Sequence, residues 1–185
     1  MSESPDSPKP VAPTPDYRIT WLSAHRELVP TLAAWHYDAF RHYVPNWSVA
    51  AAAAELATHR LHELPCTLVA LTEEGEALGS VSLLNEDPPP GGPENAPWLA
   101  SFYVRPELRG RGIGRALMQR ASSEAFDMGH AYLHLWTRDQ ATYYERHGWE
   151  RVGVVRLPVG PAILMRTRTH PNAPEPESAA EDAEP

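Results

Sequence analysis

The sequence predicts one α/β domain, in which a mixed sheet of about seven strands carries helices on its faces. Two observations support this fold class. Segments of strand and helix character follow one another in the order β-α-α-β-β-β-α-β-α-β-β. The length of 185 residues is enough for one domain with a sizeable apolar core and two short ends.

The two ends of the chain differ in composition from the region between them. Residues 1–16 hold five prolines, and residues 169–185 hold four prolines and five acidic residues. We expect both ends to be disordered tails around a folded domain at residues 17–168. The tails carry −2 and −5 of the net charge of −8, so the folded part is close to neutral at −1. This charge disfavours a general nucleic-acid-binding protein.

The single cysteine, Cys66, excludes an intramolecular disulfide and a cysteine metal cluster. It lies in the apolar run of residues 66–71, where a buried structural thiol is expected rather than a nucleophile. No apolar stretch approaches the roughly twenty residues of a membrane span, and the N-terminus lacks the basic and apolar parts of a signal peptide. We therefore expect a soluble cytoplasmic protein.

The first half of the domain is predicted to hold an edge strand, two helices and a hairpin. Apolar residues recur at spacings of three and four along the first helix, and Pro45 breaks it. Asn46 or Ser48 can cap the second, alanine-rich helix, which Pro65 ends. The predicted bounds are a strand at 17–22, helices at 25–43 and 49–63, and hairpin strands at 66–71 and 77–84 around a turn at 73–76.

The second half begins with a segment that cannot be regular structure. Residues 87–97 contain five prolines and two glycines, and loops of this length in compact domains are often functional. Gly129 is a suitable stop for the helix that follows the next strand. The predicted elements are a strand at 98–104, a helix at 112–128, a strand at 132–137, a short helix at 140–147, and strands at 149–156 and 162–168.

A glycine-rich turn between a predicted strand and a predicted helix is the clearest functional signal in the sequence. It reads Arg109-Gly110-Arg111-Gly112-Ile113-Gly114, and Arg115 follows it. The first N–H groups of a helix lack internal partners, and the helix dipole there favours an anion. Glycines let the backbone approach a phosphate and the arginines add positive charge, so the turn predicts a pyrophosphate site. A plain glycine turn is the alternative, which the interleaved arginines disfavour.

The spacing of glycines in the turn narrows the choice of phosphate-containing ligand. It lacks the Gly-x-Gly-x-x-Gly spacing of dinucleotide-binding proteins and the Gly-Lys-Ser/Thr ending of nucleoside-triphosphate loops. The pattern Arg109-x-x-Gly112-x-Gly114 instead resembles the Arg/Gln-x-x-Gly-x-Gly/Ala signature of the GNAT superfamily of acyl-CoA-dependent N-acyltransferases. Residues 143–149, Tyr-Tyr-Glu-Arg-His-Gly-Trp, and residues 104–107, Val-Arg-Pro-Glu, also resemble that family.

The resemblance covers residues 17–168 and implies a mostly antiparallel mixed sheet, with acetyl-CoA as the cosubstrate and no metal. The backbone N–H groups of residues 109–114 would hold the pyrophosphate, and the strand before them would pair with the pantetheine arm. A backbone N–H near Val104 would polarise the acetyl carbonyl. The cofactor-binding residues that the resemblance implies are Phe102, Tyr103, Val104, Arg109, Gly110, Arg111, Gly112, Ile113, Gly114 and Arg115.

Transfer to an amine also needs an acid for the leaving thiolate and a base for the amine. By resemblance Tyr144 is the acid, because a phenol has a pKa near that of a thiol. Packing against the cofactor is its alternative role, and Tyr143 is expected in the core. Glu86 and Asp87 follow the second hairpin strand and are candidate bases or amine-binding groups, unless they are merely solvated loop acids. His134, inside a strand, is a weaker candidate base.

Two further groups of residues carry less specific signals. His59 and Glu63 have helical i,i+4 spacing, but the sequence places no further ligand, so an exposed polar helix face is expected rather than a metal site. Aromatic residues near the first helix divide between the core and an acceptor cleft, which in the resembled family lies beside the first two helices. They are Trp35, Tyr37, Phe40, Tyr43 and Trp47.

The sequence thus predicts an N-acetyltransferase that moves an acetyl group from acetyl-CoA directly to a primary amine of a small molecule. A protein N-terminus or lysine is the alternative acceptor, and a non-catalytic acyl-CoA-binding regulatory module is the alternative class. An RNA-binding arginine–glycine segment is disfavoured, because such segments are repeated and basic overall. No nucleic-acid or membrane partner is expected, and the sequence leaves open whether the protein is a homodimer.

Overall fold

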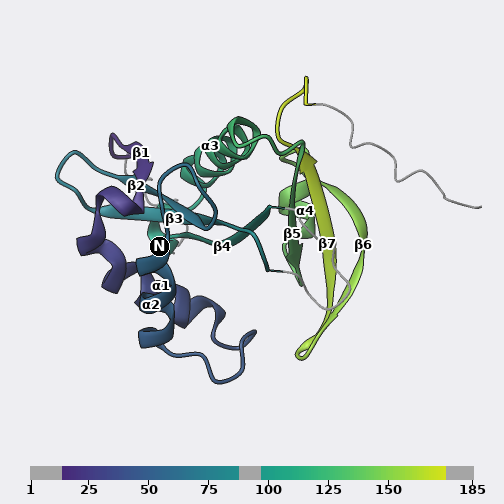
Figure 1. The fold of residues 1–185 in the computed structure, drawn as a ribbon, viewed down its shortest axis with the longest axis horizontal. Helices are drawn as coiled ribbons and strands as arrows, with labels where there is room; N and C mark the ends of the chain where they lie inside the picture. Colours follow the sequence, from purple (N-terminus) through teal and green to yellow (C-terminus); the bar gives the residue numbers. More distant parts are fainter. Residues whose placement is uncertain (1–13, 88–96, 174–185) are drawn as a thin grey trace, which may run out of the picture.

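The computed structural model describes residues 14–87 and 97–173, which form a seven-stranded sheet with helices on both faces, so the predicted fold class is confirmed (Figure 1). Most of the predicted tails and of the proline-rich loop at 87–97 lie outside these residues. The strands are β1 (Arg18–Trp21), β2 (Cys66–Leu71), β3 (Ala77–Leu84), β4 (Trp98–Val104), β5 (Tyr132–Thr137), β6 (Glu150–Leu157) and β7 (Gly160–Arg168). The α-helices are α1 (Val29–Phe40), α2 (Val49–Thr58), α3 (Ile113–Asp127) and α4 (Ala141–Glu145), with 3-10 helices η1 (Leu22–Ala24), η2 (Arg26–Leu28) and η3 (Pro106–Leu108).

The strand order β1-β2-β3-β4-β5-β7-β6 is antiparallel at every step except between β4 and β5. These two parallel strands share one register pair, Trp98 with His134, and the His134 N–H donates to the Pro97 carbonyl at 3.0 Å. Beyond this point the described residues of β4 and β5 do not pair, and Figure 1 shows β5, β7 and β6 turning away from β1–β4. The sheet therefore forks toward the C-terminal ends of β4 and β5.

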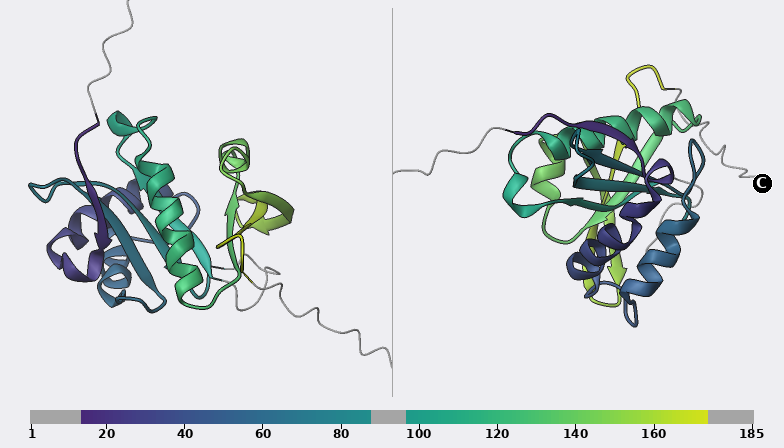
Figure 2. Two further views of the ribbon diagram at one scale, coloured as in Figure 1. Left: turned by 90° about the horizontal axis from the view of Figure 1, so that it is seen from above. Right: turned by 90° about the vertical axis from the view of Figure 1, so that its left-hand side faces the viewer.

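Helices cover both faces of the first half of the sheet (Figures 1 and 2). α1 and α2 pack on one face, against Val69 and Leu71 of β2, whereas α3 packs on the opposite face, against Leu68 and Ala70. β2 is buried along its whole length because both of its faces are covered. The core beneath α3 continues into the second half of the sheet through Leu99, Leu133, Leu135 and Met165.

α1 is shorter than the helix predicted at residues 25–43, and its buried face includes a polar residue. η2 occupies the start of the predicted helix, and Pro30 lies in the first turn of α1, where its missing N–H costs nothing. His36 is 2% exposed, whereas Trp35 is half-buried. The His36 Nε2 hydrogen-bonds the Ser80 hydroxyl of β3 at 2.9 Å, a buried polar contact that apolar periodicity does not predict.

α2 ends at Thr58 rather than at residue 63, and this corrects the prediction for His59. Ser48 caps the helix, since its hydroxyl accepts a hydrogen bond from a first-turn N–H at 3.1 Å. His59 leaves the helix with an extended backbone, and its buried side chain places Nδ1 2.6 Å from the Thr67 hydroxyl. The predicted exposed helix face with His59 and Glu63 is therefore wrong. The buried hydrogen bond outweighs the small helix preference at this end.

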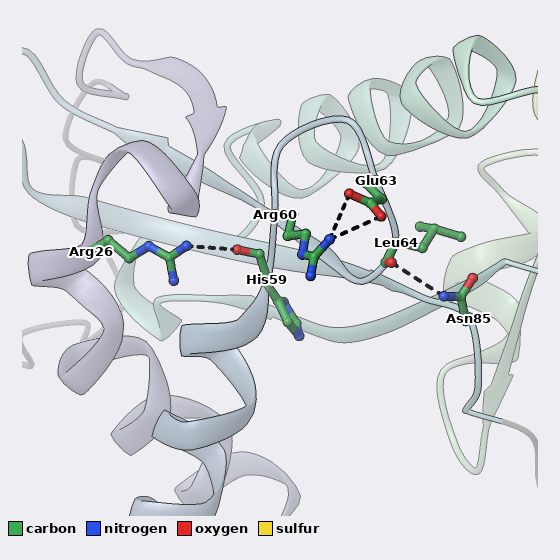
Figure 3. Close-up of polar contacts among 6 residues, drawn as sticks. All are labelled: Arg26, His59, Arg60, Glu63, Leu64 and Asn85. Carbon is green, nitrogen blue, oxygen red and sulfur yellow. Dashed lines mark hydrogen bonds and ion pairs between the residues drawn. The ribbon is translucent and has the colours of Figure 1, made fainter.

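Side chains from neighbouring elements hold the segment between α2 and β2 (Figure 3). The Arg26 guanidinium donates to the carbonyl of His59 at 3.2 Å. At the other end of the segment, the Asn85 amide donates to the carbonyl of Leu64 at 3.4 Å. The Asn85 contact ties the end of β3 to the segment that leads into β2, and so helps to place the acidic residues that follow Asn85.

The described residues make contacts with the domain beyond the predicted boundary at 168, as far as Ala173. The Thr169 hydroxyl donates to the His130 carbonyl at 2.6 Å. The His170 ring stacks on Phe126 with centroids 4.6 Å apart, and Ala173 is 5% exposed. Polar contacts of this kind leave no apolar pattern in the sequence.

Cys66 is buried, as predicted, and burial raises the pKa of its thiol to about 12. A protonated thiol in the core beneath α3 is a packing group rather than a nucleophile. Within residues 14–87 and 97–173, no helix has the length and apolar character needed to cross a membrane.

Candidate active site

The turn between β4 and α3 presents an uncapped helix N-terminus. Gly110 and Gly112 have φ of +75° and +86°, in the left-handed region that glycine adopts at low cost. Gly112 is the N-cap of α3, and no cap side chain accepts a hydrogen bond from the first turn. This 15-residue helix therefore directs unpaired donors and the positive end of its dipole into the turn.

The glycines of the turn serve two different purposes. A Cβ on Gly110 or Gly112 would meet no atom within 4 Å, so these positions need glycine for their backbone conformation and face open space. A Cβ on Gly114 would lie 3.0 Å from Phe102 Cζ and 3.0 Å from the Tyr143 hydroxyl. Gly114 therefore allows α3 to pack closely against β4 and α4, a role that the motif alone does not distinguish.

An open cavity of about 660 Å³ lies beside this turn, and we call it the turn cavity. Of the predicted cofactor-binding residues, Arg111 does not line it. The side chain of Ile113 is 1% exposed and belongs to the core, so only its backbone can face a ligand. The predicted residues that do line the turn cavity are Phe102, Tyr103, Val104, Arg109, Gly110, Gly112, Gly114 and Arg115.

Arg109 ties the turn to the end of β4. Its Nε donates to the Val104 carbonyl at 3.0 Å, and its guanidinium lies 5.8 Å from the centroid of the Tyr103 ring. The positive charge is thereby held beside the edge of β4 that has no strand partner among the described residues. An anion in the turn cavity would meet this charge and the helix donors together.

A second cavity, of about 410 Å³, adjoins the first, and we call it the acidic cavity. Four residues line both cavities: Phe40, Phe102, Gln140 and Tyr144. The carboxylates of the acidic cavity come from three parts of the chain and are Glu55 on α2, Glu86 and Asp87 after β3, and Asp139 after β5. The fork of the sheet and the first two helices bring these separate segments to one place.

The aromatic residues near α1 divide between the core and the acidic cavity. Trp35 packs against the core beneath α1 and α2 and against the Tyr103 ring at 5.3 Å. Tyr37 lines neither cavity and lies 6.4 Å from the Trp47 ring. The aromatic residues of this group that line the acidic cavity are Phe40, Tyr43 and Trp47.

Tyr144 stands where the two cavities meet. Burial raises the pKa of its phenol well above the ordinary value, and the neighbouring Tyr143 and Asp139 add to this. Its ring packs near Phe102 and Trp149, with centroids 6.4 and 5.7 Å away, and no described residue hydrogen-bonds its hydroxyl. The phenol therefore stays protonated at neutral pH and can donate to a ligand in either cavity.

Glu86 and Asp87 are neighbours in different environments. Glu86 is exposed, whereas Asp87 is half-buried. Burial raises the pKa of Asp87 to about 7, and the charge of Glu55 is the second cause. Asp87 can therefore take up and release a proton near neutral pH, as a general base must.

His134 lines neither cavity. It lies where β4 and β5 meet, with its ring 5.9 Å from that of Trp98. Burial, and secondarily the charge of Arg166, lowers its pKa to about 4, and its Nδ1 is buried without a described partner. This position at the closed end of the fork does not suit a base that acts on an acceptor.

Sequence reasoning missed several chemically important residues of the acidic cavity, among them Glu55, Trp136, Arg138, Asp139 and Gln140. Glu55 lies in an alanine-rich helix, where an isolated acid is typical of a solvated face, and the others lie near the end of β5 or just after it without forming a motif. The described parts of the chain contain no group of three or more His, Cys, Asp or Glu residues that could hold a metal ion.

A third cavity, of about 440 Å³, borders the turn cavity at Arg115 and His147. Arg146 after α4 and Arg168 on β7 add two further cationic side chains to its lining. These surroundings suit a phosphate group on a ligand that extends out of the turn cavity. The sequence did not predict this region, because three separate elements contribute to it.

The sheet is forked, and a glycine turn that suits a phosphate adjoins an acidic cavity at Tyr144. This arrangement suits a protein that passes a group from a phosphate-bearing donor to a basic acceptor. The family model described as Acetyltransferase (GNAT) family matches residues 29–149. The chain belongs to this family, and it is therefore an acyltransferase. The resemblance of the turn and of residues 143–149 is confirmed.

Solved structures share the fold at low sequence identity. An aminoglycoside 6'-N-acetyltransferase complexed with coenzyme A has a TM-score of 0.67 and 16% identity, over 86% of this chain and 99% of that one. A GNAT-family acetyltransferase from Staphylococcus aureus gives 0.64 and 14%, over 84% and 100%. A spermidine N-acetyltransferase mutant from Vibrio cholerae gives 0.61 and 14%, over 83% and 94%. The comparison with curated proteins found no match.

Proposed function

We propose that the protein transfers an acetyl group from acetyl-CoA directly to a primary amine of a small molecule. The observation that carries this proposal is the junction of the turn cavity and the acidic cavity at Tyr144. A thioester in the first cavity would there face an amine in the second. Aminoglycoside and spermidine N-acetyltransferases among the similar structures support an amine as the acceptor.

The turn cavity suits acetyl-CoA, which supplies the activated acetyl group as a thioester. The uncapped N–H groups at the start of α3 and the guanidinium of Arg115 suit the pyrophosphate. The Arg105 N–H donates to the Leu78 carbonyl of β3 at 3.1 Å, so strand alternation directs the Val104 N–H to the open edge of β4. We assign that N–H to the acetyl carbonyl oxygen, where it would stabilise developing negative charge.

We assign Tyr144 as the acid. The amine nitrogen forms a bond to the acetyl carbon while the carbon–sulfur bond breaks, and the sulfur leaves with the electron pair. Tyr144 donates its phenolic proton to that sulfur. The phenol is protonated at neutral pH when the thiolate forms, but burial raises its pKa and makes it a weaker acid, so its proton moves only as negative charge develops on the sulfur.

We assign Asp87, acting through a water, as the acceptor of the proton that the amine loses. The strand register sets Leu84 opposite Trp98, and Trp98 lies about 13 Å along β4 from Phe102 at the ordinary rise per residue. Asp87 follows Leu84 by three residues, so a water relay suits it better than direct contact. A pKa of about 7 favours Asp87 over the exposed Glu86.

The acidic cavity supports a small acceptor. Its volume of about 410 Å³ lies in the range of pockets that bind small molecules. A protein N-terminus or a lysine side chain is the alternative acceptor, and it would need only one end of this cavity.

Thiol release from acetyl-CoA, measured over a panel of small primary amines and over peptides with a free N-terminus or lysine, tests this function. We expect release with small amines, together with an acetylated product of the correct mass. Faster acetylation of the peptides would overturn the acceptor class. Absence of release with every amine and peptide would overturn the proposed reaction.

A further inference from the structure

The acidic cavity concentrates negative charge in a domain that is otherwise almost neutral. Among the described residues, four carboxylates line it against one guanidinium, that of Arg138, whereas residues 17–168 carry a net charge of only −1. None of these four carboxylates forms a hydrogen bond or an ion pair with a described residue. Acids outside the cavity are often paired, as Glu63 is with Arg60 at 3.2 Å. The charge inside the cavity is therefore left for a ligand.

Two of the four carboxylates, those of Glu55 and Asp87, interact electrostatically. Glu55 on α2 and Asp87 after β3 line the same cavity, and the charge of Glu55 contributes to the raised pKa of Asp87. Glu55 is itself exposed, and partial loss of solvent beside its neighbours raises the pKa of its carboxyl. Neighbouring carboxylates that lose solvent without gaining a cation disfavour their own ionisation, and a bound cation would relieve this cost.

Aromatic rings give the cavity a wall that suits an organic cation. Tyr43, Trp47 and Trp136 line it, and the Tyr43 and Trp136 rings meet edge to face at 5.5 Å. The faces of such rings attract ammonium groups. The hydroxyl of the half-buried Tyr144, which has no described hydrogen-bond partner, lies where the cavity joins the turn cavity. We therefore place the reacting amine at the Tyr144 end of the acidic cavity. The Glu55 carboxylate can bind a second part of the same acceptor.

We infer that the acceptor is an organic dication and that Glu55 is the specificity residue that binds its second, non-reacting ammonium group beside Asp87. This inference rests on the proposed function, because the first nitrogen must lose its proton and react at Tyr144. A monoamine leaves the negative charge of Glu55 without a cationic partner, whereas the second ammonium group of a dication neutralises it. The same carboxylates repel acceptors that carry their own carboxylate, which excludes free amino acids as good substrates.

Steady-state acetylation of matched amines tests the inference. The probes are linear diamines from 1,3-diaminopropane to 1,6-diaminohexane, each compared with the monoamine in which a methyl group replaces the distal ammonium. We expect kcat/KM to be at least about tenfold higher for the best diamine than for its matched monoamine, the scale of one hydrogen bond between charged groups. Glu55→Gln should lower the diamine kcat/KM about tenfold through KM, and should change the monoamine value less than about twofold.

Glu73→Gln is the matched control, because it removes the same charge from an exposed position in the turn between β2 and β3. It should leave both amines unaffected, and Glu55→Asp should keep part of the preference for diamines. Stabilisation by acetyl-CoA should be unchanged in all three variants, which separates acceptor recognition from folding and from donor binding. A wild-type protein without diamine preference, or an equal loss for both amines in Glu55→Gln, overturns the inference and leaves the proposed function standing. Failure of every amine overturns the proposed function itself.

Discussion

The turn cavity takes most of its lining from one stretch of chain, residues 102–115, whereas the acidic cavity is assembled from α1, α2 and the ends of β3, β4 and β5. The turn cavity offers backbone donors and arginines. The acidic cavity offers carboxylates and aromatic side chains. Because its donors belong to the backbone, the turn cavity depends on glycine conformation more than on any one side chain.

This difference separates donor binding from acceptor choice. A substitution in the glycine turn should abolish the response to acetyl-CoA whatever the amine is. A substitution in the acidic cavity should change amine selection and pH dependence while the donor still binds. Tyr144 belongs to both cavities and should affect turnover without affecting either binding step strongly.

The largest effect is expected at Gly112. Gly112→Val should abolish stabilisation by acetyl-CoA, because the new side chain would occupy the space beside the turn and the left-handed φ of +86° strains a β-branched residue. Thermal unfolding with and without saturating acetyl-CoA measures this, and a ligand at about 100 times its Kd should stabilise the wild type by about 2.7 kcal/mol.

Gly75→Val separates strain from donor binding. Gly75 has a φ of +87°, its Cβ would also meet nothing within 4 Å, and it lies in the turn between β2 and β3. Gly75→Val should unfold at a lower temperature, as Gly112→Val does, but should keep its full response to acetyl-CoA. An intact response in Gly112→Val would show that the turn cavity is not the donor site.

The second effect concerns Tyr144. Tyr144→Phe should lower kcat by about ten- to a thousandfold, and acetyl-CoA affinity should change little because the ring keeps its contacts with Phe102 and Trp149. Because burial raises the pKa of the phenol, the loss should be similar from about pH 6 to about pH 9. Tyr143→Phe is the matched control and should keep most of kcat. A loss below about threefold in Tyr144→Phe rules out the acid role.

A smaller effect is expected on the pH dependence of stability, through the ionisation of Asp87. Its pKa in the folded protein is about 7 against an ordinary value of 3.8, so its contribution to stability is complete below about pH 4 and is lost as pH rises through 7. Asp87→Asn should therefore be more stable than the wild type at pH 8 and equal to it near pH 4. The difference between these two pKa values corresponds to at most about 4 kcal/mol, and solvent screening at the half-buried Asp87 reduces the expected difference in stability to about 1 kcal/mol. Glu55, Glu86, Asp139 and Arg138 also face the cavity, and both proteins retain them.

Urea unfolding at the two pH values measures the Asp87 effect. Glu86→Gln, which changes an exposed neighbour, should show little difference between them. A wild type that is more stable than Asp87→Asn at pH 8 would mean that the carboxylate has a cationic partner, which contradicts an acidic cavity that awaits a ligand.

The smallest effect is expected when the two ends of the chain are deleted. This change tests whether the acidic cavity or the acidic ends determine the preference for cationic acceptors. Deleting residues 1–13 and 174–185 removes six of the eight net negative charges but no part of either cavity. Stability, the acetyl-CoA response and the diamine preference should remain within experimental error. A deletion that begins at Thr169 is the contrast. It also removes the contacts with His130 and Phe126, so it should lower the unfolding temperature.

The sequence by itself determined the features that contiguous residues encode. Alternation and turn signals placed the strands of the sheet, and the burial of Cys66 followed from its apolar run. The glycine turn was readable because backbone donors at a helix start depend on residues within one turn of each other. The sequence also singled out Tyr144, whose acid role stays a prediction.

Only the tertiary structure decided what depends on residues far apart in the chain. The early end of α2 reflects the buried contact of His59 with Thr67, which local helix preference does not include. The fork of the sheet follows from the single register pair between β4 and β5. Glu55 and Asp139 are 84 residues apart and line one cavity. Side chains meet in such a cavity because helices and strands pack their apolar faces, and no local pattern records which polar groups that packing brings together.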